Sequence, residues 1–178
     1  DQERLAGELF CFAIILDIGF EALLRPSEMY NVTIGRLRVP PSRRHRRSRR
    51  HILERYWRVG SVHIPRPKTF RSFGRSQFAT FKGRRPRRWA AWVMPDVPRG
   101  LRVFPGSGRR FAYLFSVMMC KFGLEDYYTL GCVRPGGATA EYMRSRDATK
   151  VRFLGRWKTD VILNTYLQEA VASYMAVE

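Results

Sequence analysis

The sequence predicts an α+β fold that is mainly helical and contains one small antiparallel sheet. Apolar residues recur at helical spacing near the start of the chain and again through its second half. Between these regions lie two short segments rich in β-branched and aromatic residues, VGSVHI and SQFATF, separated by turn-forming residues. With 178 residues, 45% of them hydrophobic, the chain is long enough to form one domain with a substantial core.

The first half of the chain is expected to contain two helices and a hairpin. A buried helix is expected over Gln2–Leu24. A short helix should start at Pro26–Glu28, because proline suits a first helical turn and an acidic residue there interacts favourably with the helix dipole. The two β-rich segments predict a β-hairpin or small sheet within residues 56–81, with Lys68 near the turn.

The second half is expected to be helical. A turn is predicted at 103–107, where the sequence is VFPGS. The predicted helices are Trp89–Met94, Gly108–Phe122, Gly136–Met143, Ala148–Leu154 and Val161–Met175.

Positive charge is concentrated in the middle of the chain. The net charge is +18, and residues 36–110 contain 23 of the 33 basic residues but only 2 of the 15 acidic ones. Clustered arginines neutralise phosphates and release counterions, so the expected partner is a polyanion bound in a salt-dependent way. The run Arg43–His51 is expected to be an exposed, mobile loop, and could serve as a nuclear localisation signal, a DNA-backbone contact or a solvated surface.

Cysteine and histidine usage indicates neither a disulfide framework nor a metal centre. The three cysteines, an odd number without a CxxC pair, favour a reducing compartment. Two of the three histidines lie in a cationic run that would repel a metal ion, and His63 lies on a predicted strand. The apolar run Leu9–Leu16 is followed by Asp17 and is too short for a signal peptide or a membrane span.

Two stretches in the first half contain residue types suited to phosphate chemistry. LLRPSEM, at Leu23–Met29, resembles the first arginine box of the tyrosine recombinase (phage integrase) family, in which a helix end supplies an arginine followed three residues later by a glutamate. Arg25 and Glu28 match that pattern. RPKT, at Arg66–Thr69, resembles the β-turn that carries the family's catalytic lysine, and Lys68 matches it.

Two further stretches follow in the order found in that family. YTLGCVRPGGAT, at Tyr128–Thr139, resembles the second box, usually His-x-x-Arg, in which Arg134 matches the arginine. GRWKTDVILNTYLQ, at Gly155–Gln168, resembles the stretch in which a histidine or tryptophan precedes the nucleophilic tyrosine by nine residues, as Trp157 precedes Tyr166. The order of the boxes and their spacing carry the resemblance, which extends over residues 5–175.

The resemblance implies one catalytic domain over residues 1–178, with an Arg-rich insertion at about 36–55, and it implies that the family's upstream DNA-binding domain is absent from this chain. It also implies a mainly helical fold with a small sheet. In the family, a tyrosine oxygen attacks a DNA phosphodiester and forms a 3′-phosphotyrosyl intermediate, so Tyr166 is the implied nucleophile. Arg25 and Arg134 would stabilise the charged transition state.

The remaining site residues have distinct implied roles. Lys68 would protonate the departing 5′-oxygen, Trp157 would donate its indole N–H to a phosphate oxygen, and Glu28 would orient Arg25 or another site residue. Gly131 stands where the family usually has the histidine of the second box, so the nucleophile's proton has no imidazole acceptor. The expected DNA-backbone contacts are Arg66, Arg71, Arg75, Arg84, Arg85, Arg87 and Arg88.

The expected partner is double-stranded DNA, bound by a self-assembled tetramer, with no membrane, small-molecule substrate, metal or cofactor. The expected location is intracellular and DNA-associated, in the nucleus of a eukaryote or otherwise in the cytoplasm or nucleoid. Two alternatives stay open. The chain could be a catalytically degenerate relative that binds DNA without cutting it, as Gly131 suggests, or an unrelated basic nucleic-acid-binding protein.

Overall fold

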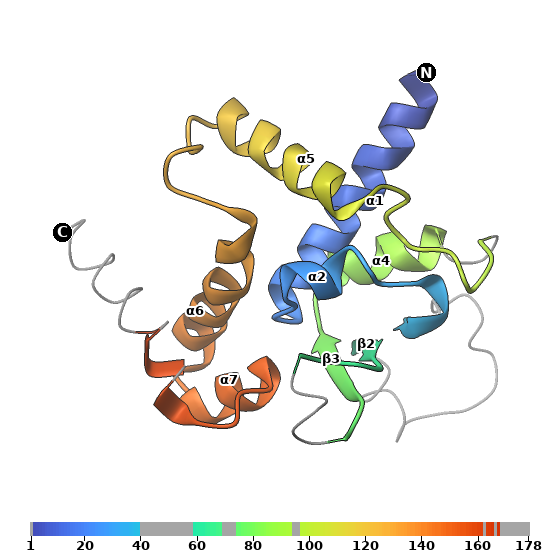
Figure 1. Ribbon diagram of the computed structural model, residues 1–178. Helices are drawn as coiled ribbons and strands as arrows, with labels where there is room; N and C mark the ends of the chain where they lie inside the picture. The colour runs from blue at the N-terminus through green and yellow to red at the C-terminus, as the bar shows by residue number, and fades with distance from the viewer. Residues whose placement is uncertain are drawn as a thin grey trace.

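The computed structural model describes residues 2–39, 59–68, 74–93, 97–161, 163–165 and 167. It confirms an α+β fold that is mostly helical with one small antiparallel sheet (Figure 1). The elements of the first half are α1 (Gln2–Glu21), α2 (Pro26–Met29), a 3-10 turn (Ile34–Arg36), β1 (Leu37–Arg38), β2 (Gly60–Ile64) and β3 (Gln77–Phe81). Those of the second half are α4 (Arg84–Val93), α5 (Gly108–Lys121), a 3-10 turn (Leu130–Cys132), α6 (Val133–Ser145) and α7 (Ala148–Gly155).

The sheet has the strand order β1-β2-β3, and both pairs are antiparallel. The predicted hairpin is therefore confirmed as β2 and β3. Strand β1 was not predicted, because Leu37–Arg38 is too short to show a period-two pattern. It pairs the start of the stretch expected to be an insertion with β2, whereas residues 40–55 of that stretch lie outside the described residues.

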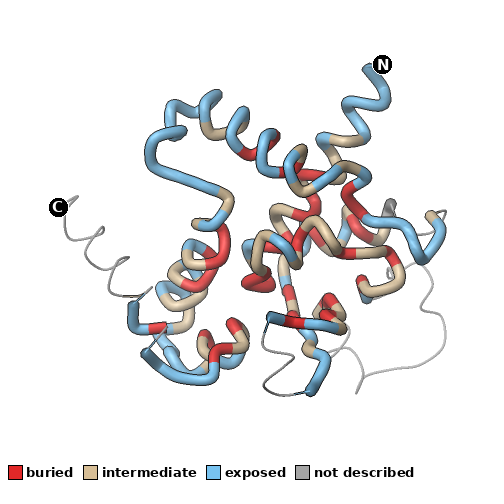
Figure 2. Tube along the Cα trace, in the orientation of Figure 1, coloured by how far each residue is buried: buried red, intermediate tan, exposed pale blue. Residues whose placement is uncertain are grey.

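Helix α1 lies at the centre of the fold. It contacts α2, α4, α5, α6 and β3, and it buries Ile14, Ile15 and Ile18 completely (Figure 2). The larger core joins this helix to the sheet, α4 and α5. The helix ends at Glu21, earlier than the expected Leu24, and Leu23 then adopts a left-handed conformation with φ of 52°.

A second, smaller core lies between the end of α1 and the helices α6 and α7. It contains Leu23, Ala138, Val151, Trp157 and Leu163. Helix α6 approaches α1 so closely at Gly137 that a Cβ atom there would collide with the Phe20 carbonyl oxygen. Gly137 is therefore a close-packing residue.

Two helices begin earlier than predicted. Helix α4 starts at Arg84 rather than Trp89, and α6 starts at Val133 rather than Gly136. In each helix a proline, Pro86 or Pro135, is the third residue. Proline is tolerated there because N–H groups of a first turn have no acceptor within the helix.

Helices α5 and α7 are confirmed within one residue of their predicted ends. Of the helix expected over 161–175, residues 161, 163–165 and 167 are helical, and the others lie outside the described residues. In the described part of the chain, no helix is both long and apolar enough to span a membrane.

Candidate active site

Glu28 joins two segments that are 128 residues apart in the sequence. Its carboxylate accepts hydrogen bonds from the backbone N–H and the Nη1 of Arg25, each at 2.9 Å, and from Nη2 of Arg156 at 2.7 Å. The Glu28 side chain is only 8% exposed; Arg156 is 7% exposed and Arg25 is 24% exposed, so the pair with Arg156 is the better shielded from water. The glutamate thus holds the end of α1 and the start of α2 against the end of α7.

Arg156 is the most enclosed basic side chain of this cluster. Its side chain is 7% exposed, and Nη2 also donates to the Leu23 carbonyl oxygen at 3.2 Å. Burial lowers the pKa of the Arg156 guanidinium; Glu28 raises it and the nearby Arg25 lowers it. Within the described structure, its buried Nε and Nη1 atoms have no hydrogen-bond acceptor. Two guanidinium groups therefore share one carboxylate, which leaves the cluster positively charged.

Arg134 is tied to the residue that precedes Arg156. It is the second residue of α6 and is 5% exposed, and its Nη2 donates to the Gly155 carbonyl oxygen at 2.5 Å. Its guanidinium carbon also lies 5.0 Å from the ring centroid of Trp157, within the range of a cation–π interaction. The backbone of Gly155 and Arg156 thus connects Arg134 and Trp157 to Glu28 and Arg25.

Gly155 is required by this arrangement. A Cβ atom at this position would collide with the Trp157 ring, so the indole can lie over the end of α7 only above a glycine. Arg156 follows in a left-handed conformation with φ of 58°, which reverses the chain toward Trp157. The local sequence Gly155-Arg156-Trp157 therefore sets the positions of the Trp157 indole and the Arg156 guanidinium.

Lys68 and Arg25 line one cavity. The cavity has a volume of about 700 Å³ and lies between α2 and β2. The basic residues that line it are Arg25, Arg36, Arg66 and Lys68, and its other polar residues include Glu28, Asn31 and His63. The structure therefore brings the first arginine box and the lysine turn to a single basic hollow.

Gly131 lies in the 3-10 turn that leads into α6 and is exposed to solvent. A Cβ atom there would meet only Thr129 Oγ1, at an ordinary contact distance of 3.4 Å. The backbone therefore has room for a side chain at the position where the resemblance expects a histidine.

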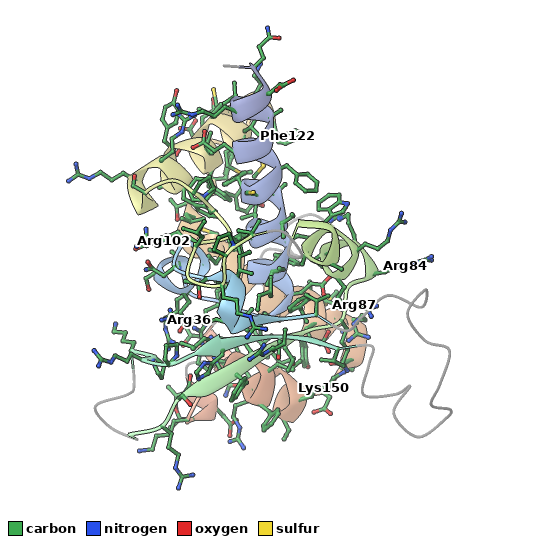
Figure 3. The ribbon with its side chains drawn as sticks, turned by 90° about the vertical axis from the view of Figure 1, so that its right-hand side faces the viewer. Arg36, Arg84, Arg87, Arg102, Phe122 and Lys150 are labelled. Carbon is green, nitrogen blue, oxygen red and sulfur yellow. The ribbon has the colours of Figure 1, made fainter. Side chains whose placement is uncertain are left out.

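The arginines expected to bind the DNA backbone differ in their contacts within the protein. Arg85 forms an ion pair with Asp17 at 2.9 Å, and Arg87 donates to the Gly83 carbonyl oxygen. The hydrogen bond and charge of Asp17 raise the Arg85 pKa. Arg84 projects away from the body at the start of α4 (Figure 3), and Arg88 is also exposed. Arg66 and Arg75 are exposed beside the turn of the hairpin.

Two expected site residues, Tyr166 and Arg71, lie outside the described residues. Leu163, which precedes Tyr166 by three residues, is fully buried in the small core with Trp157. Arg156 is the residue that the sequence interpretation missed. It stands inside the stretch chosen for Trp157 and Tyr166, but the spacing indicated only those two, and the sequence pattern does not distinguish a buried arginine from an exposed one.

Comparison with protein-family models, with curated proteins and with solved structures finds no match to this chain. Among the residues that the structure describes, no group of three or more histidine, cysteine, aspartate or glutamate side chains is arranged to hold a metal ion.

Proposed function

We propose that this chain is the catalytic domain of a DNA-breaking and rejoining enzyme of the tyrosine recombinase type. The observation that carries the proposal is the Glu28–Arg156 ion pair, because it joins the segment of Arg25 to the segment of Arg134 and Trp157. An unrelated basic protein has no reason to assemble residues of separate boxes in this way. Lys68 extends the cluster, since it shares a cavity with Arg25.

In the proposed reaction, the Tyr166 oxygen attacks the phosphorus atom of a DNA phosphodiester. A bond forms between the tyrosine oxygen and phosphorus, and the bond from phosphorus to the 5′-oxygen breaks. Lys68 donates a proton to the departing 5′-oxygen. Gly131 carries no base, so the proposed acceptor of the phenolic proton is a water molecule from the solvent. Rejoining reverses these steps with a new 5′-hydroxyl.

The proposed stabilisation of the transition state comes from charges that are already fixed. Arg25 lines the cavity and can bind phosphate oxygens directly, and Glu28 limits the directions in which its guanidinium points. Arg134 is buried, and it supplies a positive charge that water screens poorly. Preorganised charges of this kind need little reorganisation as the phosphorane forms.

The test is a covalent protein–DNA adduct that survives denaturation. The chain is incubated with a pool of nicked duplexes of random sequence, from which the leaving strand is lost after cleavage, and products are separated under denaturing conditions. We expect an adduct with the wild type and with Tyr174→Phe, and none with Tyr166→Phe. An adduct that persists in Tyr166→Phe would overturn the assignment of the nucleophile.

A second candidate function is DNA binding without cleavage, which Gly131 favours. The backbone at this position has room for a side chain, so Gly131→His can be tested without disturbing the fold. If the chain retains activity, we expect Gly131→His to increase the rate of adduct formation by about a hundredfold, the low end of the range for general acid–base catalysis. Tight DNA binding with no adduct from either protein would support the non-cleaving relative.

A further inference from the structure

The solvent-facing side of the β2–β3 hairpin carries a stacked aromatic pair. Burial alternates along both strands, and His63 lies opposite Phe78 in the register. The two ring centroids are 4.8 Å apart with an interplanar angle of 23°. Phe78 is 60% exposed, so it gains little from burial in the protein core. An exposed aromatic ring that a second ring holds in one orientation is suited to binding a ligand.

Positive charge surrounds this pair. His63 itself lines the cavity that contains Arg25 and Lys68, so the stacked rings are continuous with the candidate active site. Arg66 and Arg75, near the turn between the strands, are exposed. Basic side chains that surround exposed aromatic rings are the usual means by which proteins bind unpaired nucleic acid, because cations hold the phosphates while bases stack on the rings.

We propose that Phe78, supported by His63, is a stacking platform for an unpaired DNA base beside the cavity. A planar base would lie on the exposed part of the Phe78 ring, and Arg66 and Lys68 would hold the adjoining phosphates. The platform would accept any base, since every base presents a π face. This inference depends on the DNA binding in the proposed function but not on cleavage.

A protein partner fits this surface less well. The apolar part of the patch consists of one phenylalanine and the edge of one histidine, whereas protein interfaces are built around larger apolar centres. The flanking side chains share one sign of charge, which matches a polyanion. A single-stranded or distorted part of a DNA duplex fits both features of this surface, because an unpaired base can stack on one ring and the phosphates carry the opposite charge.

The experiment uses duplexes that carry 2-aminopurine either opposite an abasic site or paired with thymine. Binding and fluorescence quenching are measured in the Tyr166→Phe background, so that no covalent product forms. We expect the chain to bind the unpaired probe more tightly and to quench it more strongly. Phe78→Leu should lose most of the quenching and about tenfold in affinity for the unpaired probe, with little change for the paired one. Phe78→Trp should restore both.

The matched control is Phe122→Leu. Phe122 is also exposed, at 69%, but it lies at the far end of the molecule from the hairpin (Figure 3). We expect Phe122→Leu to change neither the affinity for either probe nor the quenching of its fluorescence. Equal losses on both probes with Phe78→Leu, no loss on either, or no DNA binding by the chain would overturn the platform. Quenching that depends on Phe78, together with no adduct from a chain that retains Tyr166, would reject the proposed cleavage and leave the platform standing.

Discussion

The arginines of the candidate active site and those of helix α4 are chemically the same but are held differently. Arg134 and Arg156 are almost fully buried, and each donates to a fixed oxygen acceptor. The Arg85 side chain, by contrast, is 68% exposed even though it forms an ion pair with Asp17. Buried and exposed arginines are therefore suited to two different tasks. Enclosed guanidinium groups keep one orientation, and exposed ones attract an anion of any shape.

This difference also determines how much each charge contributes to stability. A buried ion pair that loses one partner leaves an uncompensated charge in a poorly solvated place, which costs several kcal/mol. An exposed pair is replaced by water and counterions at little cost. The two regions can therefore be told apart by removing the acidic partner of each.

The largest expected effect comes from Glu28→Gln. The amide keeps the shape of the side chain but removes the charge that Arg25 and Arg156 share, so we expect a loss of about 3–5 kcal/mol in the free energy of unfolding. Urea denaturation followed by circular dichroism measures it. The matched control is Asp17→Asn, which removes the partner of the exposed Arg85 and should leave the denaturation midpoint nearly unchanged. Equal losses of unfolding free energy in Glu28→Gln and Asp17→Asn would show that burial does not distinguish the two ion pairs.

A smaller effect is expected where α6 packs on the end of α1. Gly137→Ala places a methyl group against the Phe20 carbonyl oxygen, so α6 must shift and move Arg134 with it. We expect a loss of about 1–3 kcal/mol in unfolding free energy, the usual cost of overpacking. Gly136→Ala serves as the control, because its nearest contact would be Phe20 at 3.5 Å. If the two variants unfold alike, close packing at Gly137 does not position the site.

The smallest effect on the fold is expected on α4. Arg84→Ala combined with Arg88→Ala should leave the unfolding free energy unchanged but weaken DNA binding. If each arginine neutralises one phosphate, the slope of log affinity against log salt should fall in magnitude by about 2. Fluorescence anisotropy at several salt concentrations measures this slope. Arg144→Ala, which removes an exposed arginine paired with Glu141, is the control and should leave the slope unchanged.

Much of the fold could be predicted from the sequence, because it depends on local patterns. The hairpin followed from two β-rich segments separated by turn residues, and α5 and α7 followed from apolar spacing. The errors occurred where a local rule was incomplete. The predicted starts of α4 and α6 came after Pro86 and Pro135, yet both prolines fit within a first turn. Strand β1 is two residues long and exists only because β2 pairs with it.

The intervals between candidate site residues could be read along the chain, such as the three residues from Arg25 to Glu28 and the nine from Trp157 to Tyr166. The contact of Glu28 with Arg156, the stacking of Arg134 on Trp157 and the exposure of Phe78 became evident in the folded structure. Spacing along a chain specifies neighbours within one helix or turn. Burial and long-range ion pairs depend instead on how α1, α6 and α7 pack together, and that packing is a property of the whole chain.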